Sequence, residues 1–157
     1  MQMQMINAAD APQPVGGYNQ AVAVTNAQKL AFVSGQIPVD QGGKVPEGFA
    51  DQARLAWRNV EAQLRAVGMG LENLAKVTIF LSDRRYALEN RQVRREALGE
   101  RAPAMTVIIA DIIDAAWLLE IEAMAVACGP EFAAPGAHFD NGAGACHDRR
   151  LTQQPRR

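Results

Sequence analysis

Pro103-Ala104-Met105-Thr106-Val107-Ile108-Ile109 is the stretch around which the chain is organised. Four β-forming residues follow its methionine and the proline stiffens the approach, so this stretch predicts a buried strand. A second strand is expected over residues 117–127, which contain Glu120 and Glu122. If the two strands pair, the thioether of Met105 and both carboxylates approach one another at one end of a sheet.

The composition is that of an ordinary globular domain. The chain has 157 residues, of which 48% are hydrophobic and 21% charged, and these values favour one domain with a sizeable core. A net charge of -1 gives no reason to expect nucleic acid or an anionic membrane as partner. No apolar run approaches the roughly 20 residues that span a bilayer, and residues 1–5 lack the features of a secretory signal. A cytoplasmic location is therefore expected.

Cysteine and histidine offer little chemistry. The two cysteines, Cys128 and Cys146, have no metal-ligand spacing to His138 or His147, so no metal is expected. Since both histidines follow the domain, acid–base work must fall to carboxylates, Tyr18 or a water that they hold. The chain also lacks a phosphate-cradling glycine loop, a nucleophile elbow and a His-Glu metal helix.

The first third of the chain predicts two paired strands after an extended start. Residues 1–14 are polar and contain prolines, which favours an extended lead-in. The glycine pair before Tyr18 predicts a bend, either a simple turn or one that presents the tyrosine. Residues 21–24 and 30–34 are β-rich runs around a short polar segment and predict a hairpin.

Two helices and a further strand follow. Apolar residues at spacings of three and four predict a helix over 49–67, and alternation predicts a strand over 74–81. A second helix is expected over 86–98. It carries three arginines that either bind an anion or form a solvated or subunit-bridging face: Arg91, Arg94 and Arg95. The resulting β-β-α-β-α-β-β order predicts an α+β fold with two helices on one face of a sheet.

The composition changes near residue 128. Prolines, glycines and arginine pairs without periodicity predict a flexible C-terminal tail over 128–157, which leaves 1–127 as the domain. The trio Cys146-His147-Asp148 suggests metal or thiol chemistry, but an isolated trio in such a segment is expected to have no function.

Several segments together resemble the RidA/YjgF family of small trimeric proteins, and the resemblance covers residues 11–127 in unbroken order. They are Gly16-Gly17-Tyr18-Asn19-Gln20-Ala21, Phe32-Val33-Ser34-Gly35-Gln36-Ile37-Pro38-Val39, Gln52 to Asn59 ahead of Ala66-Val67-Gly68, Lys76-Val77-Thr78-Ile79-Phe80-Leu81-Ser82-Asp83, and Glu120-Ile121-Glu122-Ala123-Met124-Ala125-Val126.

The resemblance implies a chorismate-mutase-like subunit in a homotrimer whose sheets form an inner barrel, with a cleft at each subunit interface. Active members hydrolyse reactive enamines and imines, released by pyridoxal-phosphate enzymes, to 2-keto acids and ammonia without any cofactor. In them an arginine clamps the substrate carboxylate, and a glutamate positions the attacking water.

Six residues take roles by this resemblance. Glu120 corresponds to the glutamate associated with water and Tyr18 to the tyrosine of the cleft, so both are expected to be catalytic. The remaining four are expected to bind substrate: Ser34 and Gly35 at the cleft floor, Asn90 on the second helix, and Met105.

Met105 departs from the family pattern, which has Pro-Ala-Arg-Ser where this chain has Pro103-Ala104-Met105-Thr106. Methionine has neither the charge nor the donors of a guanidinium, and losing such a charge-assisted pair costs on the order of 2–5 kcal/mol. Little activity on small 2-imino acids is therefore expected. Either Met105 simply fills the cleft, or it adapts the site to an uncharged or bulkier imine. Arg101 or Arg91 could also replace the clamp.

Two functions remain from the sequence. The first is a divergent hydrolase of an enamine, imine or related intermediate. The alternative is a non-enzymatic trimeric small-molecule binder or chaperone-like protein. Ribonuclease activity, attached to some relatives, is not expected because the charge is near neutral and no basic-aromatic surface is apparent.

Overall fold

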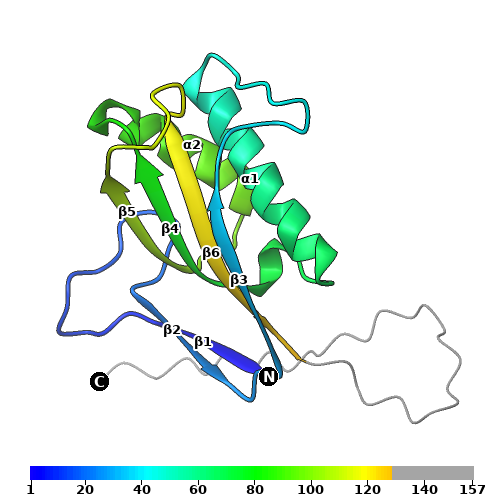
Figure 1. Cartoon of the computed structure of the whole chain (residues 1–157). Helices are drawn as coiled ribbons and strands as arrows, with labels where there is room; N and C mark the ends of the chain where they lie inside the picture. Colours follow the sequence, from blue (N-terminus) through cyan, green and yellow to red (C-terminus); the bar gives the residue numbers. More distant parts are fainter. Residues whose placement is uncertain (129–157) are drawn as a thin grey trace, which may run out of the picture.

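A four-stranded sheet covered by two helices forms most of the computed structural model, which describes residues 1–128 (Figure 1). The strands of this sheet are β3 (Lys29–Gln36), β4 (Leu74–Leu81), β5 (Ala104–Ile109) and β6 (Leu119–Ala127). The helices are α1 (Phe49–Ala66) and α2 (Ala87–Leu98), preceded by short 3₁₀ turns at Leu71–Asn73 and Arg84–Tyr86. A separate two-stranded sheet pairs β1 (Gln2–Ile6) with β2 (Ala21–Thr25).

The strand order of the larger sheet is β3-β6-β4-β5. β6 runs antiparallel to both of its neighbours, whereas β4 and β5 are parallel and are joined by the crossover through α2. The predicted α+β class with helices on one face is confirmed. The pairing considered for the Met105 strand and the 117–127 strand does not occur, because β4 lies between them.

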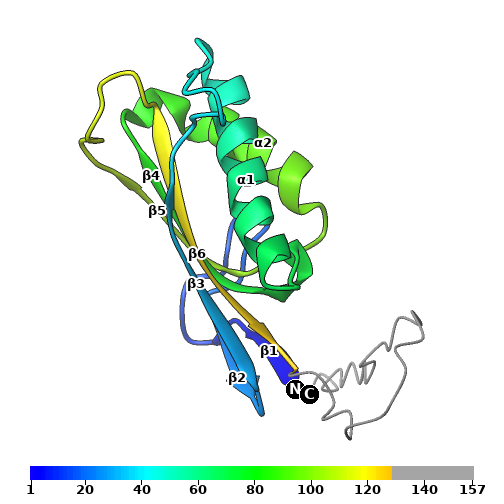
Figure 2. The same cartoon turned by 45° about the vertical axis from the view of Figure 1, so that its right-hand side comes forward.

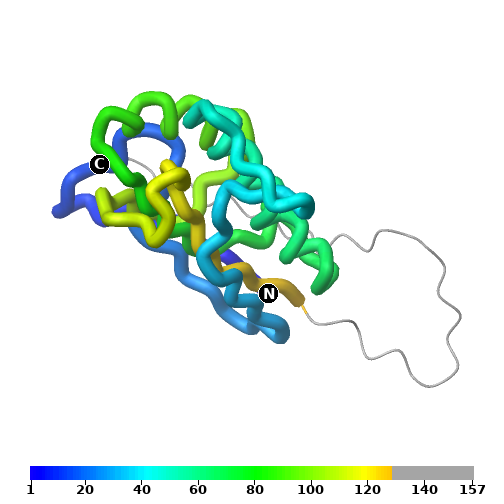
Figure 3. The backbone as a smooth tube through the Cα atoms, turned by 45° about the horizontal axis from the view of Figure 1, so that its top comes forward, coloured from blue at the N-terminus to red at the C-terminus, as the bar shows by residue number. Residues whose placement is uncertain are grey.

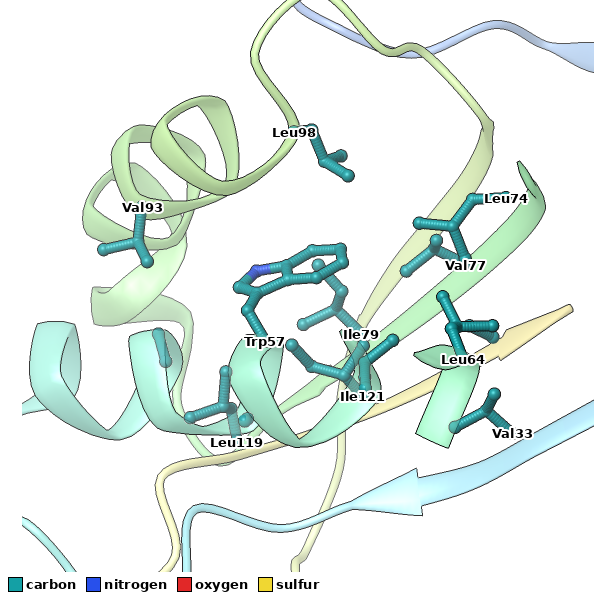
Figure 4. Close-up of a cluster of buried hydrophobic side chains, with 14 of the residues drawn as sticks. Val33, Trp57, Leu64, Leu74, Val77, Ile79, Val93, Leu98, Leu119 and Ile121 are labelled. Carbon is teal, nitrogen blue, oxygen red and sulfur yellow. The ribbon is translucent and has the colours of Figure 1, made fainter. Parts of the chain in front are cut away.

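The core lies between the helices and one face of the sheet. α1 buries an apolar stripe that includes Trp57, and the indole packs among side chains from β4, β6 and α2 (Figure 4). β6 alternates in the manner of a half-covered strand: Ile121 is fully buried, while Glu122 on the other face is exposed. Strand alternation and the helix stripe therefore point to the same covered face.

No helix covers the opposite face of the sheet in the described part of the chain (Figure 2). Large apolar side chains lie open there: Phe32 is 71% exposed, Leu30 58% and Met124 41%. Such residues give the bare face of the sheet an apolar surface in the single chain.

β5 differs from its prediction as a buried strand. Val107, Ile108 and Ile109 are 38%, 42% and 47% exposed. The physical reason is position: β5 is the last strand of the sheet and pairs only with β4. The apolar run therefore marks an edge that is open in the single chain.

The predicted hairpin between residues 21–24 and 30–34 is also wrong in its pairing. Both strands form, but β2 pairs with β1 and β3 pairs with β6. Residues 1–14 thus contain a strand where only an extended lead-in was predicted. The loop between β1 and β2 runs back to the start of β5 (Figure 3). There the backbone N–H of Asn19 donates to the Pro103 carbonyl at 3.2 Å.

Within residues 1–128, no helix is long and apolar enough to cross a membrane. The predicted tail beyond residue 128, with Cys146, His147 and Asp148, lies outside the described residues.

Ile121→Ala is expected to lower the free energy of unfolding by about 3 kcal/mol, because the side chain is fully buried and its loss leaves a cavity. Urea titration measures the change. Ile113→Ala is the matched control, since Ile113 is 94% exposed, and it should change stability by less than about 0.5 kcal/mol. Equal effects of the two substitutions would contradict the assigned core.

Candidate functional site

A cavity of about 390 Å³ lies between the loop before β2, helix α2 and strand β5. Three of the predicted site residues, Tyr18, Asn90 and Met105, line it together. The other lining residues are Val15, Gln20, Ala87, Arg91, Arg94 and Val107.

Helix α2 contributes one stripe to this cavity. Asn90 and Arg91 lie three and four residues after Ala87, and Arg94 lies four and three residues after them, so these residues share one side of the helix. Val93 lies on another face and packs into the core. The same helical period that anchors α2 therefore also directs two arginines at the cavity.

Arg94 is the buried charge of the site, with only 5% of its surface exposed. Its Nη1 donates to the sulfur of Met105 at 3.0 Å, and its Nη2 donates to the carbonyl of Gly16 at 2.8 Å. In the described part of the chain it forms no ion pair with a carboxylate, and its buried Nε has no hydrogen-bond partner. A guanidinium in such a place has unused donors.

The electrostatic surroundings of Arg94 are positive. Burial lowers its pKa, and the neighbouring charges of Arg91 and Arg95 lower it further, whereas Tyr18 acts in the opposite direction. An arginine nevertheless stays protonated at neutral pH. An anion entering the cavity would therefore relieve repulsion among the arginines as well as pair with Arg94.

Asn90 adds an unpaired acceptor. Its side chain is 2% exposed, and its buried Oδ1 has no partner among the described residues. Buried polar atoms are usually hydrogen-bonded, so an unpaired acceptor and an unpaired donor lining one cavity indicate that something else completes them. A ligand with both a donor and an anionic acceptor fits that requirement.

The structure does not bring the remaining predicted residues to this cavity. Glu120 lies against Gly35, where an added methyl group would come within 1.6 Å of the carboxylate oxygen Oε1. The glycine is therefore required for the glutamate to lie there. Ser34 lines a different cavity of about 390 Å³ on the bare face of the sheet, next to Glu122.

Strand register explains the separation. Met105 pairs with Val77 of β4, whose side chain is buried beneath the helices. Glu120 pairs with Phe80 of β4, three residues further along, whose side chain belongs to the other set of the alternation. Because side chains alternate between faces, Met105 and Glu120 lie on opposite faces of one sheet. The single chain thus carries two separate halves of the predicted site.

Among the candidate replacement arginines, Arg101 lies outside the cavity, and its Nη1 donates to the Leu98 carbonyl at 3.2 Å. Arg91 lines the cavity, but the arginine in contact with Met105 is Arg94. Of the alternatives left open for the three helix arginines, a solvated face does not apply to Arg94, which is 5% exposed. The sequence feature that indicates a cavity position for Arg94 is its spacing of four residues from Asn90, which places both residues on one helix face.

In residues 1–128, no group of three or more histidine, cysteine or acidic side chains could hold a metal ion.

Comparison with known proteins gives a consistent result. The model of the family described as endoribonuclease L-PSP matches residues 8–127. A RutC family protein of Pyrococcus horikoshii is 35% identical over 124 residues, covering 78% of this chain and 96% of the relative. Escherichia coli TdcF, whose name assigns it provisionally to the reactive intermediate deaminases, is 32% identical over 127 residues, with coverage of 78% and 96%.

Solved structures agree in fold. The crystal structure of Escherichia coli TdcF with bound serine has a TM-score of 0.60 at 33% identity and covers 79% of this chain and 98% of that one. RidA from an Antarctic Psychrobacter has a TM-score of 0.60 at 30% identity, with coverage of 79% and 99%. The chain therefore belongs to the RidA/YjgF family.

Proposed function

We propose that the protein hydrolyses a reactive enamine or imine in clefts between the subunits of a homotrimer. The observation that carries this proposal is the division of the site within one chain. Tyr18, Asn90 and Met105 line one cavity, while Glu120 and Gly35 lie together on the other face of the sheet. A neighbouring copy that brings its Glu120 to this cavity would complete a site with both a binding pocket and a carboxylate.

The reaction needs only water and the chain's own groups. In the proposed step a water held by Glu120 attacks the imine carbon and passes one proton through the carboxylate to the nitrogen, which gives a carbinolamine. The hydroxyl proton of this carbinolamine then passes to the nitrogen by the same route, so that the C–N bond breaks and ammonia leaves as the carbonyl forms. Asn90 and Tyr18 orient the substrate, so that the attacking oxygen and the carbon meet at a productive distance. An enamine would first tautomerise to the imine.

Small 2-imino acids are proposed to be poor substrates compared with bulkier imines. Together with Val15 and Val107, Met105 adds apolar surface to a cavity whose lining is otherwise largely polar, at the position where the family pattern has an arginine. The TdcF structure with bound serine supports recognition of a small amino-acid-like molecule in this family. These three apolar residues favour a larger substituent here.

The trimer is proposed on the strength of the bare sheet face. Leu30, Phe32 and Met124 are exposed side by side on β3 and β6, and an apolar surface of this kind is stabilised when further copies cover it. The edge strand β5 offers a second apolar surface beside the cavity.

Glu120→Gln is expected to reduce ammonia release by at least about 100-fold, because the amide cannot accept a proton from the attacking water. The assay uses imines generated in situ from leucine and from serine, with ammonia as the readout. Glu122→Gln is the matched control, two residues along the same strand face, and should retain activity. Full activity in Glu120→Gln would remove Glu120 from the mechanism, and no release by the wild type with any imine would favour a binding protein.

Phe32→Glu is expected to weaken the assembly, because three copies would bring uncompensated carboxylates together on the covered face. Light scattering after size-exclusion chromatography should give a trimer for the wild type and smaller species for the variant. Leu88→Glu is a suitable control, since Leu88 is 79% exposed on α2. A monomeric wild type would refute the trimer.

A further inference from the structure

We propose that Arg94 binds the anionic group of the substrate, and that this substrate is a 2-imino acid with an apolar side chain. The inference deepens the proposed function and rests on it for the choice of an imine. It assigns carboxylate recognition to helix α2, whereas the family pattern has its arginine on the strand at position 105.

The burial of Arg94 makes a purely solvated role impossible. Because the residue is only 5% exposed, its charge has given up much of its hydration, and in the described chain no carboxylate compensates for it. The Gly16 carbonyl and the Met105 sulfur accept one hydrogen bond each. Of five N–H donors, at least Nε remains without a partner.

The position of the Arg94 guanidinium also supports this assignment. Its Nη1 lies 3.0 Å from the Met105 sulfur. A longer side chain at position 105 would extend into the space that this guanidinium occupies. The positive charge that residue 105 lacks is therefore restored beside it from another element. A substrate carboxylate that would meet an arginine from β5 meets one from α2 here.

The surroundings of this charge define the rest of the ligand. Asn90, one helical turn before Arg94, lines the same cavity, and its buried Oδ1 has no partner in the described chain. We take this oxygen as the acceptor for a ligand N–H, as an imine or enamine nitrogen offers. Val15, Met105 and Val107 supply apolar surface to the same cavity, whose lining is otherwise largely polar. A carboxylate, a nitrogen donor and an apolar side chain together describe a 2-imino acid of a hydrophobic amino acid.

A structural role alone predicts a different behaviour. If Arg94 only held the Gly16 loop, its loss would weaken folding but would affect charged and uncharged ligands equally. If it binds the anion, the loss falls on the charged ligand. The comparison of a carboxylate with its amide separates the two roles.

The test uses 4-methyl-2-oxopentanoate, the stable carbonyl analogue of such an imine, and 4-methyl-2-oxopentanamide as the uncharged match, both titrated by calorimetry against the full chain. The wild type should bind the acid at least about 30-fold more tightly than the amide. Arg94→Met should remove this preference with little change for the amide. Arg94→Lys should retain part of it, because lysine keeps the charge but not the bidentate geometry.

Arg101→Met is the matched control and should bind the acid within about twofold of the wild type, since Arg101 lies outside the cavity. Thermal melting verifies that each variant is folded. An Arg94→Met protein that keeps the wild-type preference for the acid would overturn the assignment, as would a wild type with no such preference. If Arg94→Met does not fold, a crystal structure of the wild type with the acid decides: its carboxylate must lie on Arg94 and not elsewhere.

The substitution Met105→Arg provides an independent test of the same assignment. Alone it brings a second guanidinium against Arg94, so the variant should melt about 4 °C or more below the wild type. In the double variant Arg94→Met/Met105→Arg, the positive charge moves from the helix to the strand, and the preference for the acid over the amide should return. A double variant that binds the acid no better than Arg94→Met would contradict a shared position for the two guanidinium groups.

Binding and turnover fail separately in this design. A protein that binds the acid through Arg94 but releases no ammonia would refute the proposed hydrolysis and leave the assignment intact. A protein that hydrolyses imines with an unchanged rate after Arg94→Met would refute the assignment alone.

Discussion

The alternation of side chains along β6 is the constraint on which the molecule depends. Ile121 and its neighbours at every second position are buried beneath the helices, which forces Glu120 and Glu122 onto the bare face. A slip of one residue would exchange the two sets, expose the core and bury the carboxylates. The division of the candidate site between two faces is therefore a direct consequence of the hydrophobic pattern that makes the fold stable.

Local pattern predicted the parts of the fold that carry their own period. The stripe of α1 and the alternation of β4 were sufficient to place both elements almost to the residue. Pairing was a different matter, because nothing in the β2 sequence says whether β1 or β3 lies beside it. The apolar run of β5 predicts burial for a related reason. An apolar composition indicates a strand that is unfavourable in water, but it does not tell whether the same chain or another one covers the strand.

The candidate site was predictable in part. Tyr18, Asn90 and Met105 were expected on the basis of resemblance, and they line one cavity. Arg94 was missed as a cavity residue because a substitute for the missing arginine was sought near position 105 in sequence or at Arg91. Residue 94 reaches Met105 only through the crossover that packs α2 beside β5, and a contact of that kind depends on the tertiary fold.

Met105 and Arg94 are best understood as one unit. A buried guanidinium without an anionic partner lowers stability, so it persists only where something offsets it, and here a backbone carbonyl and a polarisable sulfur do so incompletely. An arginine at position 105 would crowd this charge, whereas the thioether leaves space and accepts a weak hydrogen bond. The donors that remain unused are already oriented before any ligand arrives. Under the proposal that an anion binds here, its binding would recover the free energy lost by burying them in the empty protein, which is the physical meaning of a preorganised site.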